Sequence, residues 1–561
     1  MGFDKEVDFL IIGSGAAAMA AGIRAHDLGL ETVLVEKGSH YGGSTAMSGG
    51  VVWVGNNPHM ASVGIADSDA ETLEYLRHIT AGEVPEAKLR AYVEGAQRTL
   101  AYLSEKAHLE VMPIAKYTDY YPEAPGGKMG ARSLEPRPFD GSRLGDTFAT
   151  LQAPARSALV LGKLMITATM AQKFIVLRLS SLLTLMGCFL GYLLRRGKRK
   201  RFGRDTHLTN GNALVGRLRL GLKDRSVPLW LDSPARELLV DEGRVVGAVV
   251  HRGEETLRVG ARKGVLIAAG GFSRNLEMRA AHGPGPASID WTAGNSNNTG
   301  DGIEMGKAVG GALDLMGEAW WTPVTQYPGT RDGWVLVVEK SLPGAIFVNG
   351  HGRRFTNESA PYVDVGLAQY RDHAETGCSI PAWMVFDARY RKNYIAGPVG
   401  PGKALPDKRL PRKLRKDFLR KASSLAALAE KIDVDAAGLE ETVTRYNEMA
   451  MAGVDADYGR GTSASDQYYG DPRVKPNPCM APLNSGPYYA IPVFPGDLGT
   501  KGGLITDAAA RVLNADGHII PGLFAAGNAS ASMMGRTYPG AGGTIGPALT
   551  FGFLAAETAS G

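Results

Sequence analysis

The sequence predicts an α/β protein whose first domain binds a dinucleotide, and three observations near the N-terminus carry that prediction. Phe9 to Ile12 is a short apolar run, typical of a parallel strand buried on both faces. Gly13-Ser14-Gly15-Ala16-Ala17-Ala18 follows at once, matches G-x-G-x-x-A and opens an Ala-rich helical run. A second apolar strand, Thr32 to Val35, ends at an acid, Glu36.

Each residue type in this unit has a physical task. Gly13 permits the tight turn, Gly15 lets a pyrophosphate approach the backbone, and Ala18 lets helix and strand pack closely. The helix N-terminus offers free N–H groups and a partial positive charge to the phosphates. Glu36 can accept hydrogen bonds from a ribose hydroxyl. The alternative is an ordinary glycine-containing turn between strand and helix.

The segment after Glu36 is rich in small and hydroxylic residues. We predict a loop lying against the cofactor, although a flexible surface loop is the alternative. The residues assigned to it are Lys37, Gly43, Ser44, Thr45, Ser48, Gly49 and Gly50. Small side chains let a backbone approach a flat ligand, and the hydroxyls supply donors.

Later segments predict returns of the chain to the same cofactor. Gly264 to Phe272 reads as a buried strand ending in Ala269-Gly270, and Asp301 precedes a helix. Near the end, a strand closes in Gly527-Asn528, and a Gly-rich loop containing Gly543 leads to a helix from about Ile545. Each piece alone is equally consistent with a plain turn, so the prediction depends on their combination.

Composition sets wider limits. With 561 residues, 44% of them hydrophobic, the chain is long enough for at least two domains. Its three cysteines lie far apart and form no metal or disulfide pattern, so we expect no metal and a reducing compartment. The charged N-terminus lacks the apolar core of a secretory signal, so we expect the cytoplasm.

The net charge of +5 is unevenly distributed. Residues 151–205 hold eleven Lys/Arg and one acid, Asp205, so the basicity belongs to one segment and does not indicate nucleic-acid binding. Leu179 to Leu194 is uncharged and mostly apolar, and a basic cluster follows at 195–201. The run is shorter than the roughly 20 residues that a spanning helix needs. On a helical wheel, Arg156, Lys163 and Arg178 fall on one stripe upstream of it.

This pattern predicts one or two helices lying on an anionic membrane surface through residues 155–204. A buried helical insertion, an oligomer contact and a true span are the alternatives. Elsewhere, 67–104 reads as largely helical, 229–250 as strands around a hairpin turn, and 435–453 as a helix. The composition changes from about residue 319, and a second domain is predicted at 322–489.

The motifs GSGAAA, Glu36 and GGST together resemble the FAD-binding half of the fumarate reductase/succinate dehydrogenase-like flavoproteins. The resemblance implies FAD rather than NAD. No His is placed for a bond to the flavin, so we expect non-covalent FAD. Diacid-reducing members of that group need Arg and His anchors, whereas this chain offers Tyr362 and Tyr538 at the corresponding places. Phenols suit a neutral ketone better than a diacid.

DYYPEAPGG, RFTNESAPY, PGDLGTKGG and MGRTYPGAGGTIGPALTFG are similar to motifs of the 3-ketosteroid Δ1-dehydrogenases. The similarity covers nearly the whole chain except 151–205. It implies desaturation of the C1–C2 bond of a 3-keto-4-ene steroid, with FAD as the first oxidant and a quinone or another electron acceptor afterwards. The expected fold class is α/β: a Rossmann-like FAD-binding domain at 1–321 and 490–561, an inserted α+β catalytic cap domain, and the membrane-associating insertion.

The resemblance also implies roles for individual residues. Tyr538 and the Gly542 N–H would polarise the C3 oxygen, and Tyr362 would take the C2 proton. Tyr120 or Tyr117 would assist that base, and the sequence does not choose between them. For any single tyrosine the alternative is packing with a satisfied hydroxyl. Thr500 to Gly503 lie beside the chain's return to the first domain and receive no chemical role.

Two rival functions remain open from the sequence. A 3-ketosteroid Δ4-(5α)-dehydrogenase would act on the adjacent bond with the same flavin fold, and a membrane-docked sterol-binding flavoprotein would lack turnover. An amphipathic platform beside the site would suit steroids that keep an alkyl side chain, because these partition into bilayers. We therefore expect a peripheral position on the inner face of the membrane.

Overall fold

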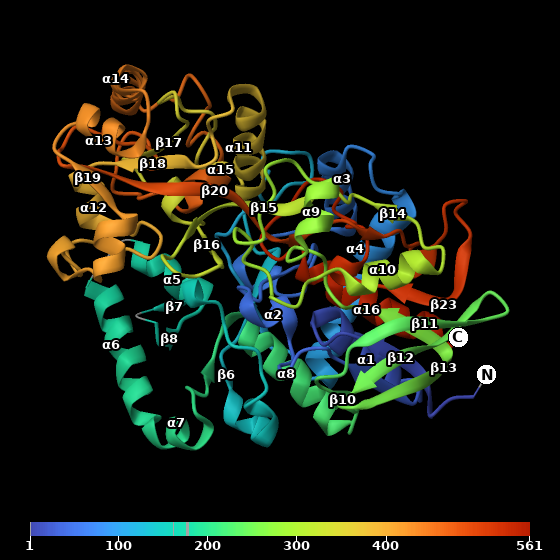
Figure 1. Cartoon of the computed structure of the whole chain (residues 1–561). Helices are drawn as coiled ribbons and strands as arrows, with labels where there is room; N and C mark the ends of the chain where they lie inside the picture. The colour runs from blue at the N-terminus through green and yellow to red at the C-terminus, as the bar shows by residue number, and fades with distance from the viewer. Residues whose placement is uncertain (1, 161, 176–178) are drawn as a thin grey trace.

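The structure is a computed structural model that describes residues 2–160, 162–175 and 179–561, with side chains described outside 173–182. Two large sheets dominate it, one in each half of the molecule (Figure 1). Both chain ends lie beside the first sheet (Figure 1). Of the predicted helix stripe, Arg178 lies outside the described residues, and the side chain of Lys173 is not described.

The first sheet has the strand order β10-β2-β1-β13-β12-β11, with β23 paired to the end of β13 and β22 to β23. Strands β1 (Lys5–Ile12), β2 (Thr32–Val35), β13 (Glu255–Ile267) and β23 (Ile519–Ala525) run parallel, which confirms the predicted strand–helix–strand unit. Strands β11 (Ala235–Asp241) and β12 (Arg244–Arg252) form the predicted antiparallel hairpin. The carboxyl ends of the parallel strands meet at one edge, where ligands bind in such sheets.

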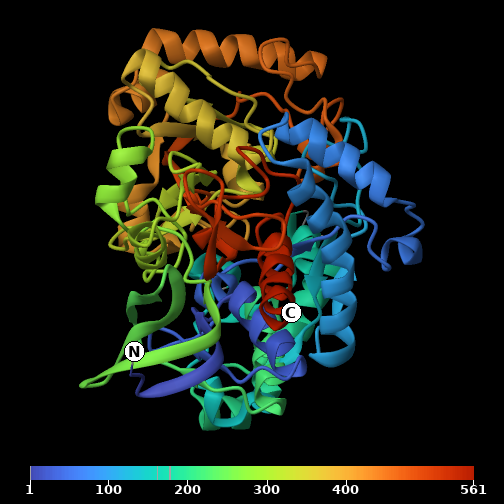
Figure 2. The same ribbon diagram turned by 90° about the vertical axis from the view of Figure 1, so that its right-hand side faces the viewer.

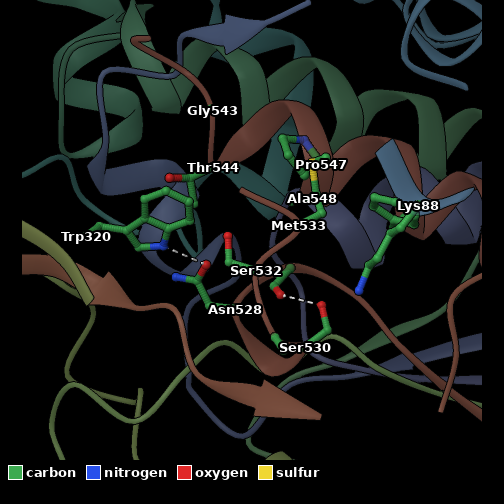
Figure 3. A pocket seen from close by; sticks show the side chains of 13 residues that line it. Lys88, Trp320, Asn528, Ser530, Ser532, Met533, Gly543, Thr544, Pro547 and Ala548 are labelled. Atoms are coloured by element: carbon green, nitrogen blue, oxygen red, sulfur yellow. Dashed lines mark hydrogen bonds between the residues drawn. The ribbon is translucent and has the colours of Figure 1, made fainter. Parts of the chain in front are cut away.

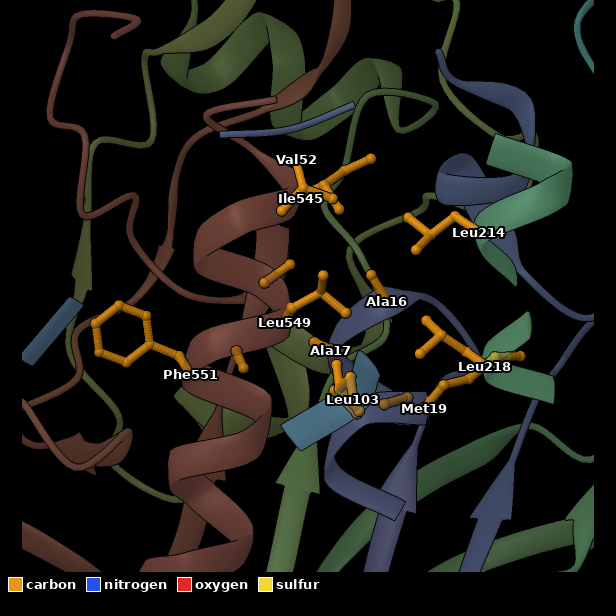
Figure 4. Packing of buried hydrophobic residues seen from close by; sticks show 14 of the residues in the cluster. Ala16, Ala17, Met19, Val52, Leu103, Leu214, Leu218, Ile545, Leu549 and Phe551 are labelled. Carbon is orange, nitrogen blue, oxygen red and sulfur yellow. The ribbon is translucent and has the colours of Figure 1, made fainter. Parts of the chain in front are cut away.

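Helices α1 (Ala16–Asp27) and α16 (Ile545–Ser560) pack against each other over this sheet. Figure 4 shows Ile545 and Leu549 of α16 facing the alanines of α1, with Leu214 and Leu218 of α8 beyond them. A Cβ at Gly552 would lie 2.2 Å from the Ala17 carbonyl oxygen, so only glycine allows this approach. Figure 2 shows the C-terminal helix, in red, beside the blue helices of the N-terminal region.

The second sheet has the order β16-β15-β20-β18-β17, with β19 also paired to β20. Strand β20 (Tyr488–Thr500) pairs with β15 (Ala319–Gln326) along one edge and with β18 (Ala382–Phe386) along the other. Helices α11 (Tyr362–Thr376), α13 (Leu425–Ile432) and α14 (Ala436–Ala452) pack near it, and α14 confirms the helix predicted at 435–453. The boundary predicted at 322 falls inside β15.

The remaining elements connect these layers. The helices are α2 (Gly43–Met47), α3 (Asp69–Thr80), α4 (Glu86–Lys106), α5 (Ala168–Ile175), α6 (Leu179–Leu194), α7 (Arg196–Phe202), α8 (Asn210–Asp224), α9 (Leu276–His282), α10 (Asp301–Ala308), α12 (Ala388–Asn393) and α15 (Ala464–Tyr468). The strands are β3 (Val52–Trp53), β4 (Val111–Pro113), β5 (Ser133–Pro136), β6 (Phe139–Asp140), β7 (Leu159–Val160), β8 (Leu164–Met165), β9 (His207–Leu208), β10 (Leu229–Trp230), β14 (Leu313–Asp314), β16 (Gly333–Val335), β17 (Ala345–Val348), β19 (Arg420–Ala422), β21 (Gly503–Leu504) and β22 (Arg511–Leu513).

One local prediction was wrong and another was confirmed. The segment after Glu36 is not all loop, because α2 begins after Gly42, whose φ of 108° turns the chain into the helix. Residues 67–104 are largely helical, as predicted, and form α3 and α4. The break between these helices lies where Ala81 adopts a left-handed conformation and Pro85 precedes α4.

The insertion differs from its predicted form in its first half. Strands β7 at 159–160 and β8 at 164–165 pair antiparallel where a helix was predicted, so Arg156 and Lys163 do not share a helical stripe. The second half matches, because α6 spans the apolar run and α7 carries the basic cluster. Both helices stand at the margin of the molecule (Figure 1). Within the described residues, no helix is both long and apolar enough to cross a bilayer.

Candidate active site

The nucleotide end of the site is built where β1 passes into α1. Gly13 has φ +118°, and a Cβ there would lie 2.2 Å from the Ala268 carbonyl oxygen. Among the described residues, the only atom within 4 Å of a Cβ built at Gly15 would be Thr45 Oγ1, at 3.5 Å. Gly15 has no side chain to cap α1, and Thr45 Oγ1 accepts from the first N–H of the helix, that of Ala16. A glycine turn with this much room, leading into a helix N-terminus, is what a pyrophosphate requires.

Glu36 is a partly buried acceptor next to this turn. Ser14 Oγ donates to Glu36 Oε2 (2.5 Å), and the Gly38 N–H donates to Glu36 Oε1 (2.8 Å). Burial raises the pKa of the Glu36 carboxyl, although both donors oppose the shift. Each oxygen has a second lone pair, so Glu36 can still accept from a ribose hydroxyl.

Lys37 and Asp301 were predicted separately as cofactor residues, and the structure joins them. Lys37 Nζ lies 2.6 Å from Asp301 Oδ2 and also donates to Thr299 Oγ1. Burial disfavours the ionised carboxyl of Asp301, but the hydrogen bonds from Lys37 and Thr299, together with the positive charge of Lys37, outweigh burial and lower the pKa. The pair ties the end of β2 to the start of α10, and its charges largely neutralise each other.

The Ser44-Thr45 segment is tied to residues that sequence reasoning missed. Ser44 Oγ accepts from the Asn295 N–H and from Asn298 Nδ2, each at 2.9 Å. Thr45 Oγ1 accepts from the Ala16 N–H at 3.2 Å. Asn298 also fills the space that a Cβ at Gly270 would need, at 2.6 Å. The available sequence signal for these asparagines was the run NSNNTGD, from which only the start of a helix was predicted.

The C-terminal returns meet around a small pocket. Its lining includes Trp320, Asn528, Ser530, Gly543 and Thr544 (Figure 3). Trp320 Nε1 donates to Asn528 Oδ1 at 3.2 Å, and Ser530 Oγ donates to the Gly527 carbonyl at 2.9 Å. Ile545 begins α16 beside this loop. Predicted cofactor residues of the C-terminal stretch therefore lie together with Trp320, which sequence reasoning missed.

Four tyrosines form a buried cluster. Tyr362 begins α11, Tyr538 lies in the loop before α16, and Tyr120 and Tyr117 lie in the loop after β4. Ring centroids are 5.4 Å apart for Tyr362 and Tyr538, and 5.3 Å apart for Tyr120 and each of these two. The Tyr538 hydroxyl is 3.1 Å from Thr544 Oγ1. The structure therefore unites all four tyrosines that sequence reasoning selected.

Burial sets the protonation state of this cluster. It raises the pKa of Tyr362 and of Tyr120 well above the ordinary value for a phenol, and it raises the pKa of Tyr538 as well. For Tyr538 the bond with Thr544 opposes the shift. The phenols are therefore neutral at physiological pH, and each offers a donor toward the space between them.

Tyr120 and Tyr117 hold different positions. Tyr120 contacts both Tyr362 and Tyr538, whereas Tyr117 contacts Tyr120, with 3.4 Å between their hydroxyl oxygens. Tyr469 was missed, and its hydroxyl donates to Tyr117 at 3.0 Å. Tyr468 stacks on Tyr117 with 4.3 Å between ring centroids. The adjacent pair Tyr468-Tyr469, between proline-rich and glycine-rich stretches, was the available signal.

Gly542 was expected to be glycine so that a substrate oxygen can approach, but the neighbouring backbone also requires glycine there. Its φ is +96°, and a Cβ would lie 2.5 Å from the Trp53 backbone nitrogen and 2.6 Å from the Val51 carbonyl oxygen. Glycine is thus required by the neighbouring strand β3 as well as by any ligand. The Gly542 carbonyl accepts from the Trp53 N–H at 3.2 Å. Among the described residues, no protein acceptor pairs with the Gly542 N–H.

These features fit FAD. The roomy glycine turn at Gly15, the N-terminus of α1 and the acceptor Glu36 suit its ADP half. The pocket lined by Asn528, Gly543 and Thr544 lies in the loops expected to contact its ring system. In the described part of the chain, no group of three or more His, Cys, Asp or Glu side chains is arranged to hold a metal ion.

Comparison with known proteins agrees with this geometry. A family model described as an FAD binding domain matches residues 8–545. A 3-oxosteroid 1-dehydrogenase from Mycobacterium tuberculosis is 43% identical over 98% of this chain and 98% of its own length. The crystal structure of the 3-ketosteroid Δ1-dehydrogenase from Sterolibacterium denitrificans, in complex with 1,4-androstadiene-3,17-dione, is 43% identical. It superposes with a TM-score of 0.96 over 99% of both chains.

A more distant match shows the fold alone. The 3-ketosteroid Δ4-(5α)-dehydrogenase from Rhodococcus jostii is 21% identical, with a TM-score of 0.66 over 100% of this chain and 98% of its own. Fold, nucleotide site and family match define an FAD-dependent oxidoreductase of the α/β flavoprotein class. Within that class the chain belongs to the 3-oxosteroid 1-dehydrogenase family.

Proposed function

We propose that this chain catalyses FAD-dependent 1,2-desaturation of 3-oxo-4-ene steroids. The observation that carries the proposal is the buried contact of Tyr362, Tyr538 and Tyr120 beside the converging cofactor loops. When bound, FAD supplies the acceptor for the electron pair that leaves C1. The protein's own residues must bind the ketone, stabilise the developing enolate and remove the C2 proton.

The Tyr538 hydroxyl and the free Gly542 N–H are the two donors for the C3 oxygen. Both lie in one loop, and a water-poor site strengthens their interaction with a developing negative charge. Thr544 Oγ1 holds the Tyr538 hydroxyl in place at 3.1 Å. Neutral donors of this kind polarise an uncharged carbonyl without favouring a carboxylate substrate.

Tyr362 takes the C2 proton. Because burial raises its pKa, the phenol has to pass on its own proton as it receives the one from C2. Tyr120 is the nearer assistant, since its ring touches Tyr362. The hydroxyls continue from Tyr120 through Tyr117 to the partly exposed Tyr469, and a proton passed along them leaves to solvent.

Incubation of the holoenzyme with 4-androstene-3,17-dione under anaerobic conditions tests the function. Bleaching of the flavin together with a 1,2-desaturated product is the expected result. A 4,5-desaturated product would support the Δ4-(5α) alternative, and binding without bleaching would support the sterol-binding alternative. The physiological electron acceptor, a quinone or another oxidant, is then identified by reoxidation of the bleached enzyme.

The insertion provides attachment to the inner face of the membrane in this proposal. Five apolar residues on α6 are 48–59% exposed, namely Leu183, Met186, Phe189, Leu190 and Leu193. Their spacing places them on one side of the helix, and the basic α7 follows. An exposed apolar face next to a cationic end suits an anionic lipid surface. Helix α5 precedes α6 and approaches the tyrosine cluster, because Gln172 Nε2 donates to the Tyr468 carbonyl at 3.5 Å.

We also propose the two-domain division, with the FAD-binding domain at 1–321 and 490–561 and the catalytic cap domain at 322–489. Two separate apolar cores around the second sheet support it. Substrates in this proposal include sterones that retain an alkyl side chain.

A further inference from the structure

Two buried lysines hold the backbone directly before the two proposed reacting tyrosines. Lys340 Nζ donates to three successive carbonyls, those of Glu358 (3.3 Å), Ser359 (3.0 Å) and Ala360. These residues lead through Pro361 into Tyr362. Lys501 Nζ donates to the carbonyl of Thr537 at 2.6 Å, and Tyr538 is the next residue.

We infer that Lys340 and Lys501 are positioning residues that fix Tyr362 and Tyr538 in their reacting orientation. The inference rests on the proposed roles of the two tyrosines. Neither lysine carries a side-chain ion pair within 4 Å among the described residues, although each is less than 5% exposed. Burying an ammonium without a carboxylate partner lowers the stability of the folded protein. We therefore take the two lysines to serve the position of the tyrosines rather than stability.

The chemistry of the ammonium explains the choice of residue at 340. A charged lysine has three N–H donors and no acceptor. At Lys340 all three are matched by three carbonyls whose lone pairs would otherwise be unsatisfied at the entry to α11. Arg460 supports the arrangement from the other side, because its Nη2 donates to the Lys340 carbonyl at 3.2 Å.

Lys501 acts through two contacts. Besides the Thr537 carbonyl, its ammonium lies 4.6 Å from the centroid of the Trp320 ring. Trp320 packs edge-on against Tyr538, with 4.7 Å between centroids. The ammonium therefore restrains Tyr538 in two ways, through the carbonyl of the preceding residue and through the Trp320 ring that packs against it. Arg536 adds ion pairs to Glu83 (3.0 Å) and Glu318 (3.2 Å) in the same loop.

Both ammonium groups titrate near neutral pH. Burial lowers the pKa of Lys501 to about 7, and Glu318, Asp364 and Glu83 oppose the shift while Arg536 adds to it. Burial also lowers the pKa of Lys340 to about 8. There Asp466, Cys479 and Asp364 oppose the shift, whereas Arg460 adds to it. A neutral amine has two donors and no charge, so both clamps weaken as pH rises.

The test compares holoenzyme variants over pH 6–10 with 4-androstene-3,17-dione and an artificial acceptor. Lys501→Met should lower kcat about 10- to 100-fold, since an error of about 1 Å in geometry costs about that much. KM should change less than about threefold. Lys501→Arg should restore most of kcat and move the alkaline limb upward by more than about one pH unit, because a guanidinium stays charged.

Lys340→Met should give a similar loss, but Lys340→Arg should not restore it, because a planar fork cannot face three successive carbonyls. Peptide-resolved hydrogen exchange provides a readout apart from turnover: residues 532–538 in Lys501→Met and 356–364 in Lys340→Met should exchange faster. Flavin absorbance and melting temperature are measured beside each variant. Arg391→Met is the control for a buried cation, since Arg391 is 3% exposed and donates to the carbonyls of Gly400 and Leu405 rather than to a carbonyl before a proposed reacting tyrosine.

The inference would be overturned if both methionine variants had the same dependence of kcat on pH as the wild type and the same hydrogen-exchange rates. If a methionine variant fails to fold, the wild-type and Lys501→Arg profiles decide, and coincident alkaline limbs in the two would sink the proposal. Full activity in Tyr362→Phe and Tyr538→Phe would instead refute the proposed function itself. Failure of the lysine inference and failure of the proposed function can therefore be told apart.

Discussion

Tyr362 and Tyr538 face each other edge to face, with 5.4 Å between ring centroids and 76° between ring planes. One begins a helix of the second sheet's half of the molecule, and the other lies in the loop that leads into the C-terminal helix of the first. The contact therefore joins the two halves at the place where a flat ketone substrate would have to lie.

Removing either hydroxyl should stop the reaction while preserving the fold. We expect Tyr538→Phe and Tyr362→Phe to lower kcat at least about 100-fold, the usual value of an oxyanion donor or a general base. Steady-state kinetics and flavin absorbance measure the loss and the retained cofactor. Tyr446→Phe is the control, because Tyr446 is also buried but belongs to α14 and packs in a separate core. Unchanged turnover in both active-site variants would refute the roles.

The two glycines of the nucleotide turn should respond differently to alanine. Gly13→Ala forces a Cβ to within 2.2 Å of the Ala268 oxygen at φ +118°, so the protein itself should lose stability. Gly15→Ala meets only Thr45 Oγ1, at 3.5 Å, so the apoprotein should fold normally and bind FAD at least about tenfold more weakly. Thermal melting of the apoprotein and fluorescence titration with FAD separate the two effects. Equal FAD affinity in Gly15→Ala and wild type would contradict the prediction that the pyrophosphate of FAD binds at this turn.

The flavin should be removable without breaking a covalent bond. Acid precipitation of the holoenzyme is expected to leave the yellow FAD in the supernatant, because no histidine is among the described residues that line the pocket next to Asn528 and Gly543. Flavin that remained with the pellet after denaturation would show a covalent link and contradict the expectation.

Lys88 gives a pH prediction whose sign follows from its environment. Burial lowers its pKa to about 8, against 10.5 in an unfolded chain, while Asp507 and Asp314 oppose the shift. The folded protein thus binds fewer protons than the unfolded chain between about pH 8 and 10.5, and the full cost of burying the ammonium is present below pH 8. Lys88→Met should raise stability at pH 7 by roughly 2 kcal/mol after loss of the Thr506 bond, with a gain that fades toward pH 10. Melting temperatures at the two pH values measure it, and a variant less stable than wild type at pH 7 would contradict it.

The exposed face of α6 should control binding to lipid. Replacing Leu183 and Leu190 by Glu is expected to reduce co-sedimentation with anionic vesicles at least about tenfold, because it removes buried apolar area and adds repulsion. Deletion of 155–204 should in addition lower activity on sterones with an alkyl side chain more than on short steroids. Leu276→Glu is the matched control, since Leu276 is 50% exposed on α9. Equal vesicle binding by all variants, or equal losses on both substrates, would reject the platform.

Several elements followed from the sequence because their signals are local. The unit β1–α1–β2 is fixed by apolar runs, a glycine turn and an acid within one short stretch, and α6 coincides with an uncharged, mostly apolar run. The hairpin β7–β8 was misread as helix, because apolar residues with few charges do not separate a short hairpin from a helix. Tyr469 and Asn295 were missed, since each acts through a partner far away in the chain.

By itself, the sequence determined the α/β class, the nucleotide turn and the choice of tyrosines, because those depend on residue type and short spacing. Only the tertiary structure decided that Tyr120 touches both Tyr362 and Tyr538, that Gly542 is fixed by the backbone of Trp53, and that two lysines brace the reacting loops. Those relationships arise when two sheets and a C-terminal helix pack together. Contacts between residues that are far apart in the sequence leave no repeating pattern of residue types from which they could be predicted.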